Sequence, residues 1–484
     1  MRIYGSLINN KKRIHLMGIG GVSMSAIAVM LKKDGHIITG SDSFLSKNVE
    51  KLREEGINVN IGANLDDVEK ADLIIYTNAV PEKDPELSYA RSIGKEIIER
   101  SDFMGIFTKI FDECISICGT HGKTTTTSMT SLCFIEGKKD PSIQVGAYLK
   151  NINSNFRVGN SEYLVIESCE YKDSFLKFNP DTVAVLNVDL DHVDYFKDIE
   201  DIKKSFKKFM QKVPKGGKIF VNGDDENIKD ILEKNKFEAE IITIGKNDKS
   251  FYNYKNIKYS YESNEKDETG YNSNKEYMEF DLYQKDKKID KIRLNVLGEH
   301  NAFNASISAA IALSYDIDIE DIKKGLLKFE GASRRFEYKG KVNGARVFDD
   351  YAHHPTEIKS LGQAVEKLDK HKSFAVFEIH TFTRAERFED QFGKALSSFD
   401  NIIIAPIYRA RKDGAREVTQ EEIKEKILEY DKNKNVIYFE NYEEIKEYLL
   451  KTVTSGDVIF TIGAGNVTKL ADALVKEDKN NKDK

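Results

Sequence analysis

The sequence lacks the features that mark membrane and secreted proteins. No apolar run approaches the roughly 20 residues of a membrane-spanning helix, and the longest runs are strand-sized. The first residues contain no signal-peptide core followed by a cleavage site. Only four cysteines occur in 484 residues, too few for a disulfide framework: Cys114, Cys118, Cys133 and Cys169. Cys114 and Cys118 are spaced C-x-x-x-C on a predicted strand, and no second such pair completes a zinc site. We therefore expect a cytoplasmic protein without membrane insertion, whose cysteines are buried, reduced thiols.

Basic residues are not in excess. Lysine and arginine total 74 against 80 acidic residues, which gives a net charge of −6. Nucleic-acid-binding proteins usually carry a basic surplus, so we expect no nucleic-acid partner. Tyrosine alternates with lysine between residues 246 and 296, but acidic residues lie among them. We interpret this stretch as a solvated antiparallel sheet.

Short apolar runs alternate with amphipathic stretches along most of the chain, a pattern typical of α/β domains with parallel sheets. Such a series starts near residue 13, again at 114, and again near 345. At roughly 150 residues a domain, the length also suits three domains. We predict a Rossmann-like domain (1–107), a central phosphate-loop α/β domain with an added antiparallel sheet (108–331), and a Rossmann-like C-terminal domain (332–484).

A glycine-rich loop follows the first predicted strand. The stretch "MGIGGVSMSAIA", residues 17 to 28, opens a predicted helix and resembles the dinucleotide-binding fingerprint, except that Ser23 replaces the third glycine. Backbone N–H groups at such a helix N-terminus bind a pyrophosphate. Asp42 lies about 24 residues after Gly18, near where a ribose-binding acid would follow. The loop predicts a pyrophosphate site but leaves open whether the ligand is a nicotinamide cofactor.

A second glycine loop lies in "CISICGTHGKTTTTSM", where a strand ends at Cys118 and a helix begins at Lys123. Glycines let backbone N–H groups approach phosphate, and lysine neutralises the outer phosphates. The Thr124 hydroxyl is placed to bind Mg²⁺, although the loop is two residues shorter than the strict phosphate-loop motif. We predict an ATP site formed by Gly119, Thr120, His121, Gly122, Lys123, Thr124 and Thr125.

Acidic residues follow two further predicted strands. Glu167 and Glu170 come after "EYLVI", and the run after "TVAVLN" holds Asp189, Asp191, His192 and Asp194. The carboxyl ends of strands form the ligand-binding rim of an open α/β sheet. Such carboxylates and imidazoles are the candidates for Mg²⁺ ligands opposite the phosphate loop.

Three later stretches carry further polar candidates. Asn301 and Asn304 in "LGEHNAFNASISAAIAL" suit either a helix cap or an adenine edge. "EGASRRFEY" contributes Arg334 and Arg335. "FDDYAHHPTEI" contributes a cluster before a helix that begins with a proline: Asp349, Asp350, Tyr351, His353 and His354. Because adjacent side chains point apart, the two histidines do not favour a shared metal site.

Together, "GTHGKTTTTSM", "DHVDYF", "GEHNAFNA", "SRRFE", "DDYAHHPTE" and "HTFTR" resemble the Mur ligases from about residue 13 to 470. The resemblance implies a UDP-sugar-binding first domain, an ATP-binding central domain and an amino-acid-binding C-terminal domain. It also implies ATP-driven amide formation between UDP-N-acetylmuramate and L-alanine, through an acyl phosphate, in peptidoglycan precursor synthesis. Such chemistry depends on positioning and charge neutralisation rather than on a protein nucleophile.

The resemblance also implies roles for single residues. Lys123 would bind the outer phosphates, Thr124 one Mg²⁺, and Glu167 and His192 a second Mg²⁺. The remaining ATP contacts would come from Asn301, Asn304, Arg335 and Asp350. Tyr351, His380 and Arg384 would bind the amino acid, with the arginine suited to a bidentate carboxylate pair. The UDP-sugar would lie on Gly18, Gly20, Gly21, Ser23 and Asp42.

Two stretches depart from the family pattern. "ESCEYK" carries Cys169 and Lys172 where relatives have acids, and "HTFTR" carries Thr381 where many have a second arginine. Some sister ligases use a carbamylated lysine after the "DH" motif, but no lysine here is assigned that role among Lys203, Lys204 and Lys207.

Three alternative functions remain. A sister ligase would attach a recycled murein peptide to the same UDP-sugar. A nicotinamide-dependent oxidoreductase would use the first loop but leave Lys123, Glu167, His192 and Arg335 without roles. A non-catalytic UDP-sugar-binding protein would not need these charged residues. The sequence permits a monomer or a homodimer.

Overall fold

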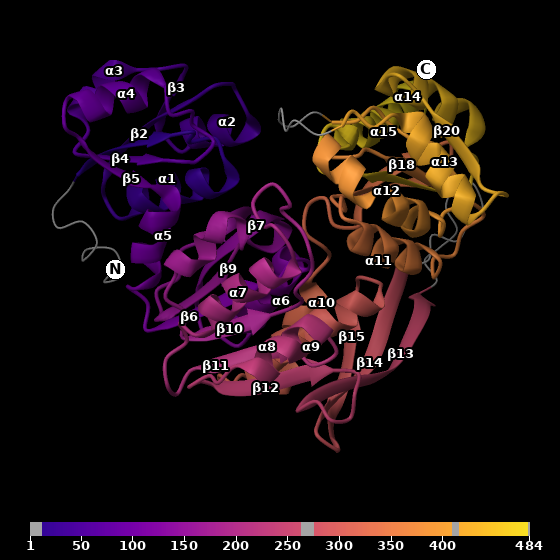
Figure 1. Cartoon of the computed structure of the whole chain (residues 1–484), viewed down its shortest axis with the longest axis horizontal. Coiled ribbons are helices and arrows are strands. Elements are labelled where there is room, and N and C mark those ends of the chain that lie inside the picture. Colours follow the sequence, from indigo (N-terminus) through magenta and orange to yellow (C-terminus); the bar gives the residue numbers. More distant parts are fainter. Residues whose placement is uncertain (1–11, 263–274, 409–415, 483–484) are drawn as a thin grey trace. The chain divides into compact units, whose positions relative to one another are not determined.

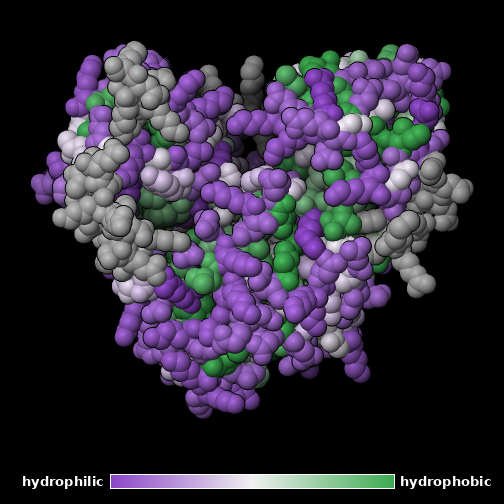
Figure 2. Space-filling view, turned by 180° about the vertical axis from the view of Figure 1, so that it is seen from behind, coloured by the Kyte–Doolittle hydropathy of each residue, from purple (hydrophilic) through white to green (hydrophobic). Residues whose placement is uncertain are grey.

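The computed structural model describes residues 12–262, 275–408 and 416–482. It divides into two compact units. Unit 1 comprises Met1–Asp189, Glu200–Phe251 and Ile307–Gly325, and unit 2 comprises Leu190–Ile199, Tyr252–Ser306 and Leu326–Lys484. Within the described ranges, no helix is both long and apolar enough to span a membrane. Hydrophilic residues cover most of the face seen in Figure 2, and apolar residues form separate patches.

The N-terminal sheet is parallel, with strand order β3-β2-β1-β4-β5 (Figure 1). Its strands are β1 (Arg13–Met17), β2 (Ile37–Asp42), β3 (Asn58–Ile61), β4 (Leu73–Tyr76) and β5 (Glu96–Glu99). Its helices are α1 (Val22–Lys33), α2 (Lys47–Glu54), α3 (Leu65–Lys70), α4 (Pro85–Ser92) and α5 (Arg100–Thr108). The strand order reverses between β1 and β4, and loops diverge at such a point, so a ligand crevice is expected beyond the end of β1.

The central sheet within unit 1 has the order β12-β11-β10-β6-β9-β7-β8, and β8 alone runs antiparallel to its neighbour. Its strands are β6 (Glu113–Cys118), β7 (Ser142–Leu149), β8 (Ser154–Arg157), β9 (Tyr163–Glu167), β10 (Thr182–Val185), β11 (Lys218–Asn222) and β12 (Glu240–Gly245). The associated helices are α6 (Lys123–Glu136), α7 (Ile199–Met210), α8 (Glu226–Lys234), α9 (Glu299–Leu313) and α10 (Ile319–Lys328). Strand β6 lies between β9 and β10, and its residues 114–118 are fully buried.

Three antiparallel strands confirm the sheet expected from the tyrosine-rich stretch. They are β13 (Tyr252–Glu262), β14 (Lys275–Gln284) and β15 (Lys287–Leu294). Apolar side chains alternate on β14, where Met278, Phe280 and Leu282 are buried. The polar residues between them leave the other face to solvent, as the period-two pattern predicts.

The C-terminal sheet has the order β16-β17-β21-β18-β19-β20, parallel except at β16. Its strands are β16 (Glu337–Val342), β17 (Ala345–Asp350), β18 (Ser373–Phe377), β19 (Asn401–Ile404), β20 (Asn435–Tyr438) and β21 (Val458–Ile462). Its helices are α11 (Pro355–Val365), α12 (Phe382–Leu396), α13 (Gln420–Tyr430), α14 (Tyr442–Thr452) and α15 (Val467–Lys482). These three α/β assemblies confirm the predicted fold class.

One expectation about the cysteines is wrong. Cys114, Cys118 and Cys133 are buried, but Cys169 is exposed. The first two lie on the central strand β6 and the third on the buried side of α6. Cys169 follows the end of β9, where the chain has left the sheet, and this explains its exposure.

Candidate active site

The second glycine loop connects β6 to α6 in unit 1. Gly119 has a φ of 142° and Gly122 a φ of 82°, conformations that side chains other than glycine rarely adopt. A Cβ on Gly119 would also lie 2.9 Å from the Cβ of Leu186. Gly122 is the N-cap of α6, so the helix begins at the loop with its N–H groups directed outward. This is the backbone arrangement of an anion site.

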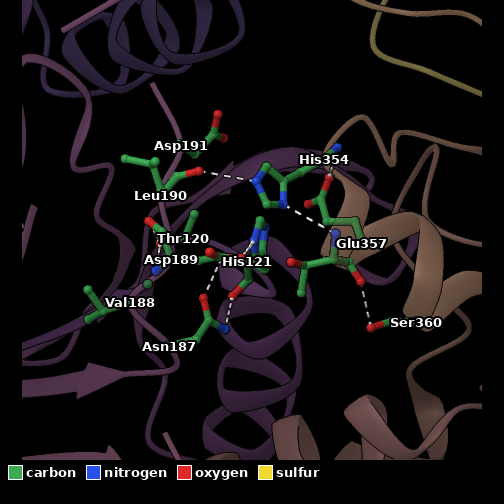
Figure 3. A network of polar contacts seen from close by, with 12 residues as sticks. Thr120, His121, Asn187, Val188, Asp189, Leu190, Asp191, His354, Glu357 and Ser360 are labelled. Carbon is green, nitrogen blue, oxygen red and sulfur yellow. Dashed lines mark hydrogen bonds and ion pairs between the residues drawn. The ribbon is translucent and has the colours of Figure 1, made fainter. Parts of the chain in front are cut away.

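The segment after β10 supports the loop from the side (Figure 3). The backbone N–H of His121 donates to Asn187 Oδ1 at 2.7 Å, and Asn187 Nδ2 donates to the His121 carbonyl at 3.0 Å. Thr120 Oγ1 donates to the carbonyl of Asp189 and accepts from its N–H. His121 Nε2 lies 3.1 Å from Asp189 Oδ2. These contacts hold the loop in place, and no sequence motif pointed to the role of Asn187.

Lys123 bends back over its own loop. Its Nζ donates to the carbonyls of Gly119 at 2.5 Å and Thr120 at 2.9 Å. The same Nζ lies 3.0 and 3.2 Å from the two carboxylate oxygens of Glu170, which is 1% exposed. Burial by itself would lower the pKa of Lys123, but the charge of Glu170 raises that pKa above its usual value. The lysine is therefore held in its charged form.

Thr124 and Glu167, which the family resemblance assigned to two different Mg²⁺ ions, lie beside each other. Thr124 Oγ1 donates to Glu167 Oε1 at 3.1 Å, and Glu167 Oε2 accepts from the N–H of Gly146 at 2.6 Å. A Cβ at Gly146 would lie 2.6 Å from both carboxylate oxygens, so glycine is required for this approach. Thr125 is in the same first turn of α6. A hydroxyl and a carboxylate so close together match the oxygen ligands that Mg²⁺ prefers.

His192 lies in Leu190–Ile199, which belongs to unit 2. It has a φ of 50°, and its N–H donates to Asp191 Oδ1 at 2.7 Å. Asp191 is buried and also accepts from Arg384 Nη2 at 2.6 Å. Burial would raise the pKa of Asp191, but the charge of Arg384 lowers it well below the usual value. Arg384 therefore already has a carboxylate partner within unit 2.

The other predicted amino-acid contacts surround Arg384. Its Nη1 lies 3.2 Å from His380 Nδ1, and the His380 ring stacks on Tyr408 at 5.5 Å. His353 lies at the edge of the His380 ring, and burial lowers the pKa of His353 to about 4. His354 instead caps α11 and lies with its Nε2 3.1 Å from the Leu190 carbonyl (Figure 3). The adjacent histidines thus have different partners.

Two residues predicted to contact ATP lie at the start of the C-terminal domain. Arg335 Nη1 lies 3.5 Å from Glu357 Oε1, and its guanidinium lies over the Tyr351 ring at 5.2 Å. Asp350 accepts from the N–H groups of Phe336 and Ala352 at 2.8 Å. Burial raises the pKa of Asp350 to about 6, against the opposing charge of Arg335. Both side chains therefore have intradomain partners.

The two asparagines expected near adenine are buried on α9. Asn301 Nδ2 donates to the Leu297 carbonyl at 2.7 Å. Asn304 Nδ2 donates to Asn301 Oδ1 at 3.3 Å. Neither asparagine lies on a solvated helix face, and the side-chain amide of Asn301 stabilises the turn that precedes α9.

The first glycine loop borders a cavity of about 670 Å³ in the N-terminal domain. All five residues predicted for the UDP-sugar line it: Gly18, Gly20, Gly21, Ser23 and Asp42. Asp42 Oδ2 accepts from the N–H of Gly20 at 2.8 Å. Arg100 also lines the cavity, and its Nη1 lies 3.4 Å from Ser23 Oγ. Arg100 was not predicted from the sequence, because it lies far along the chain from the glycine loop, at the start of α5.

Family models match most of the chain. The model "Mur ligase family, catalytic domain" matches residues 13–112, "Mur ligase middle domain" residues 117–312, and "Mur ligase, glutamate ligase domain" residues 334–465. A UDP-N-acetylmuramate–L-alanine ligase of Caldicellulosiruptor saccharolyticus is 41% identical over 464 residues, covering 96% of this chain and 98% of the relative. The Clostridium botulinum protein of the same name is 39% identical, with 96% and 98% covered.

Solved structures share the fold. The UDP-N-acetylmuramate–alanine ligase of Thermotoga maritima has a TM-score of 0.79 at 23% identity, covering 97% of this chain and all of its own. A murein peptide ligase of Psychrobacter arcticus has a TM-score of 0.69 at 22% identity, with 97% and 99% covered. The resemblance deduced from the motifs is confirmed, and the chain belongs to the Mur ligase family.

Proposed function

We propose that the chain joins L-alanine to the carboxylate of UDP-N-acetylmuramate in a reaction driven by ATP. The observation that carries this proposal is 39–41% identity, over nearly the whole chain, to ligases named for this reaction. Lys123, and the pair of Thr124 and Glu167, at the loop after β6 support it, because a protein that only binds the UDP-sugar would not need them. The step belongs to peptidoglycan precursor synthesis.

The chemistry begins at the sugar carboxylate. One carboxylate oxygen attacks the γ-phosphorus of ATP, the bond to the β-phosphate oxygen breaks, and ADP leaves. The ammonium of L-alanine first loses a proton to solvent. The amine then attacks the acyl carbon, phosphate leaves with the pair of electrons of the C–O bond, and the nitrogen releases a second proton to solvent as the amide forms. Both steps gather negative charge on phosphate oxygens, so positioned cations and N–H groups are the main source of rate enhancement.

The residues of the chain would divide these tasks. The N–H groups at the start of α6 and the ammonium of Lys123 would hold the outer phosphates of ATP. Thr124 would hold one Mg²⁺, and Glu167 and His192 a second, and these ions would neutralise phosphate and carboxylate charge. Contacts to the rest of ATP would come from Asn301, Asn304, Arg335 and Asp350.

The substrates would occupy two further places. The cavity beside Gly18, Gly20 and Gly21 would bind the UDP-sugar, with the diphosphate at the N-terminus of α1. Tyr351, His380 and Arg384 would bind L-alanine, whose carboxylate would replace Asp191 on the guanidinium. The three domains would keep the boundaries predicted above, and the enzyme would act in the cytoplasm.

A direct assay tests the function. The purified chain is given ATP, Mg²⁺, UDP-N-acetylmuramate and either L-alanine or the tripeptide that a recycling ligase would use. We expect phosphate release with L-alanine and a nucleotide product heavier by one alanine residue. Release with the tripeptide alone would contradict the proposal and favour the sister ligase.

A further inference from the structure

Glu170, the acidic half of a buried ion pair with Lys123, has no role in the chemistry described so far. Glu170 comes from the segment after β9, 47 residues along the chain from Lys123. Strands β6 and β9 are parallel neighbours, with Ile117 opposite Glu167, and this register brings the two segments together. Glu170 is 1% exposed and the Lys123 side chain 13% exposed. The pair is thus shielded from water at the mouth of the loop.

The contacts of Lys123 account for its whole donor capacity. An ammonium group has three protons. Four oxygen atoms compete for them: the Gly119 and Thr120 carbonyls and both carboxylate oxygens of Glu170. A phosphate that approaches Lys123 must therefore displace at least one of these acceptors. The carbonyls are held less strongly than the carboxylate, because the carboxylate carries a full charge opposite to that of the ammonium whereas a carbonyl offers only a dipole.

We propose that Glu170 is a positioning residue for Lys123, which it orients before ATP binds and keeps in place while phosphate replaces the loop carbonyls. This inference rests on the proposed function. Glu170 acts through the lysine and touches no reacting atom. Without its charge, the four-carbon lysine stem is free to take other rotamers, and a misplaced cation stabilises the transferring phosphate less.

The test compares Glu170→Gln with wild type in the full chain. The amide keeps the shape and a hydrogen-bond acceptor but removes the charge. We expect kcat to fall about 10- to 100-fold, with the KM for UDP-N-acetylmuramate within about threefold of wild type. Glu113→Gln is the matched control, since Glu113 lies at the far end of β6 and accepts a hydrogen bond from Tyr315 at 2.8 Å. We expect its kcat to stay within about twofold of wild type.

A double-mutant cycle separates this role from an independent one. If Glu170 acts through Lys123, adding Glu170→Gln to Lys123→Ala produces no further loss of kcat. Additive losses would overturn the inference, as would a folded Glu170→Gln variant with wild-type kcat. Glu170→Asp keeps the charge and is the variant to use if Glu170→Gln does not fold. We expect its loss of kcat, on a logarithmic scale, to be less than half of the loss in Lys123→Ala. A loss equal to that of Lys123→Ala would overturn the inference. Failure of the proposed function would instead appear in wild type, as absent phosphate release.

Discussion

The two glycine-rich loops share a backbone plan and differ in the side chains around it. Both follow a central parallel strand and open a helix, α1 in the N-terminal domain and α6 in the central domain. The loop at Gly18–Gly21 borders a cavity of about 670 Å³ and faces Asp42 and Arg100. The loop at Gly119–Gly122 is instead followed by a lysine hydrogen-bonded to one carboxylate and a threonine hydrogen-bonded to another.

This difference separates binding from chemistry. Helix N–H groups alone hold a diphosphate that does not react. Phosphoryl transfer also needs a positioned cation and metal ligands, because charge moves during the step. We therefore expect substitutions in the first loop to change the affinity for the UDP-sugar, and substitutions around the second loop to change kcat.

The largest effect is expected from Lys123→Ala. Removing the ammonium leaves Glu170 buried without this partner and leaves the phosphate charge less neutralised. We expect kcat to fall about a thousandfold, as for other groups that stabilise developing charge. Calorimetric titration with UDP-N-acetylmuramate is the internal control and should give wild-type affinity. Weakened sugar binding would show that the two loops are not separate in function.

A smaller loss is expected from Glu167→Gln. The amide can still accept from Thr124 and Gly146 but is a poorer ligand for a divalent cation. We expect kcat at saturating Mg²⁺ to fall about 100-fold and the Mg²⁺ concentration for half-maximal rate to rise. Phosphate release measured across a Mg²⁺ titration tests both. An unchanged Mg²⁺ dependence would exclude Glu167 as a ligand.

Substitutions in the first glycine loop should change the affinity for the UDP-sugar rather than the rate. A Cβ on Gly20 would lie 2.8 Å from both Asp42 Oδ2 and the stiff, buried side chain of Val49. We expect Gly20→Ala to raise the KM for the UDP-sugar about tenfold and to change kcat little. In Gly21→Ala the nearest atom would be 3.4 Å away, so its effect should be smaller. Equal effects of the two variants on KM would argue against this steric account.

The smallest effect is expected from Ser23→Gly, which restores the dinucleotide fingerprint. The third glycine of that fingerprint serves helix–strand packing, so the UDP-sugar KM should change less than about threefold. Titration with NADH should show no binding to either protein. Tight NADH binding by the wild-type chain would revive the oxidoreductase alternative.

The sequence predicted the fold best where strands are buried on both faces. Apolar runs such as "CISIC" and "TVAVLN" mark β6 and β10, which lie inside the central sheet. It missed strands at sheet edges, such as β3, β5, β16 and β20, and also the interior, buried strand β11. Edge strands are short and partly exposed, so their residues carry little apolar periodicity. The spacing of glycine and lysine residues predicted the positions of the loops that follow the central strands β1 and β6.

Contacts between distant segments could not be predicted in the same way. The pairing of Lys123 with Glu170 depends on β9 lying beside β6, although β7 and β8 separate them in the chain. Sequence order does not specify spatial order in such a sheet. The exposure of Cys169 depends on the same turn after β9.

The measurement that tests the account most directly traces the carboxylate oxygen atoms of the sugar substrate into the released phosphate. UDP-N-acetylmuramate labelled with ¹⁸O in its carboxylate is incubated with the chain, ATP, Mg²⁺ and L-alanine, and the released phosphate is analysed by mass spectrometry. Because a carboxylate oxygen attacks the γ-phosphorus, the account predicts one ¹⁸O atom in each phosphate formed from doubly labelled carboxylate. Phosphate without ¹⁸O would contradict it.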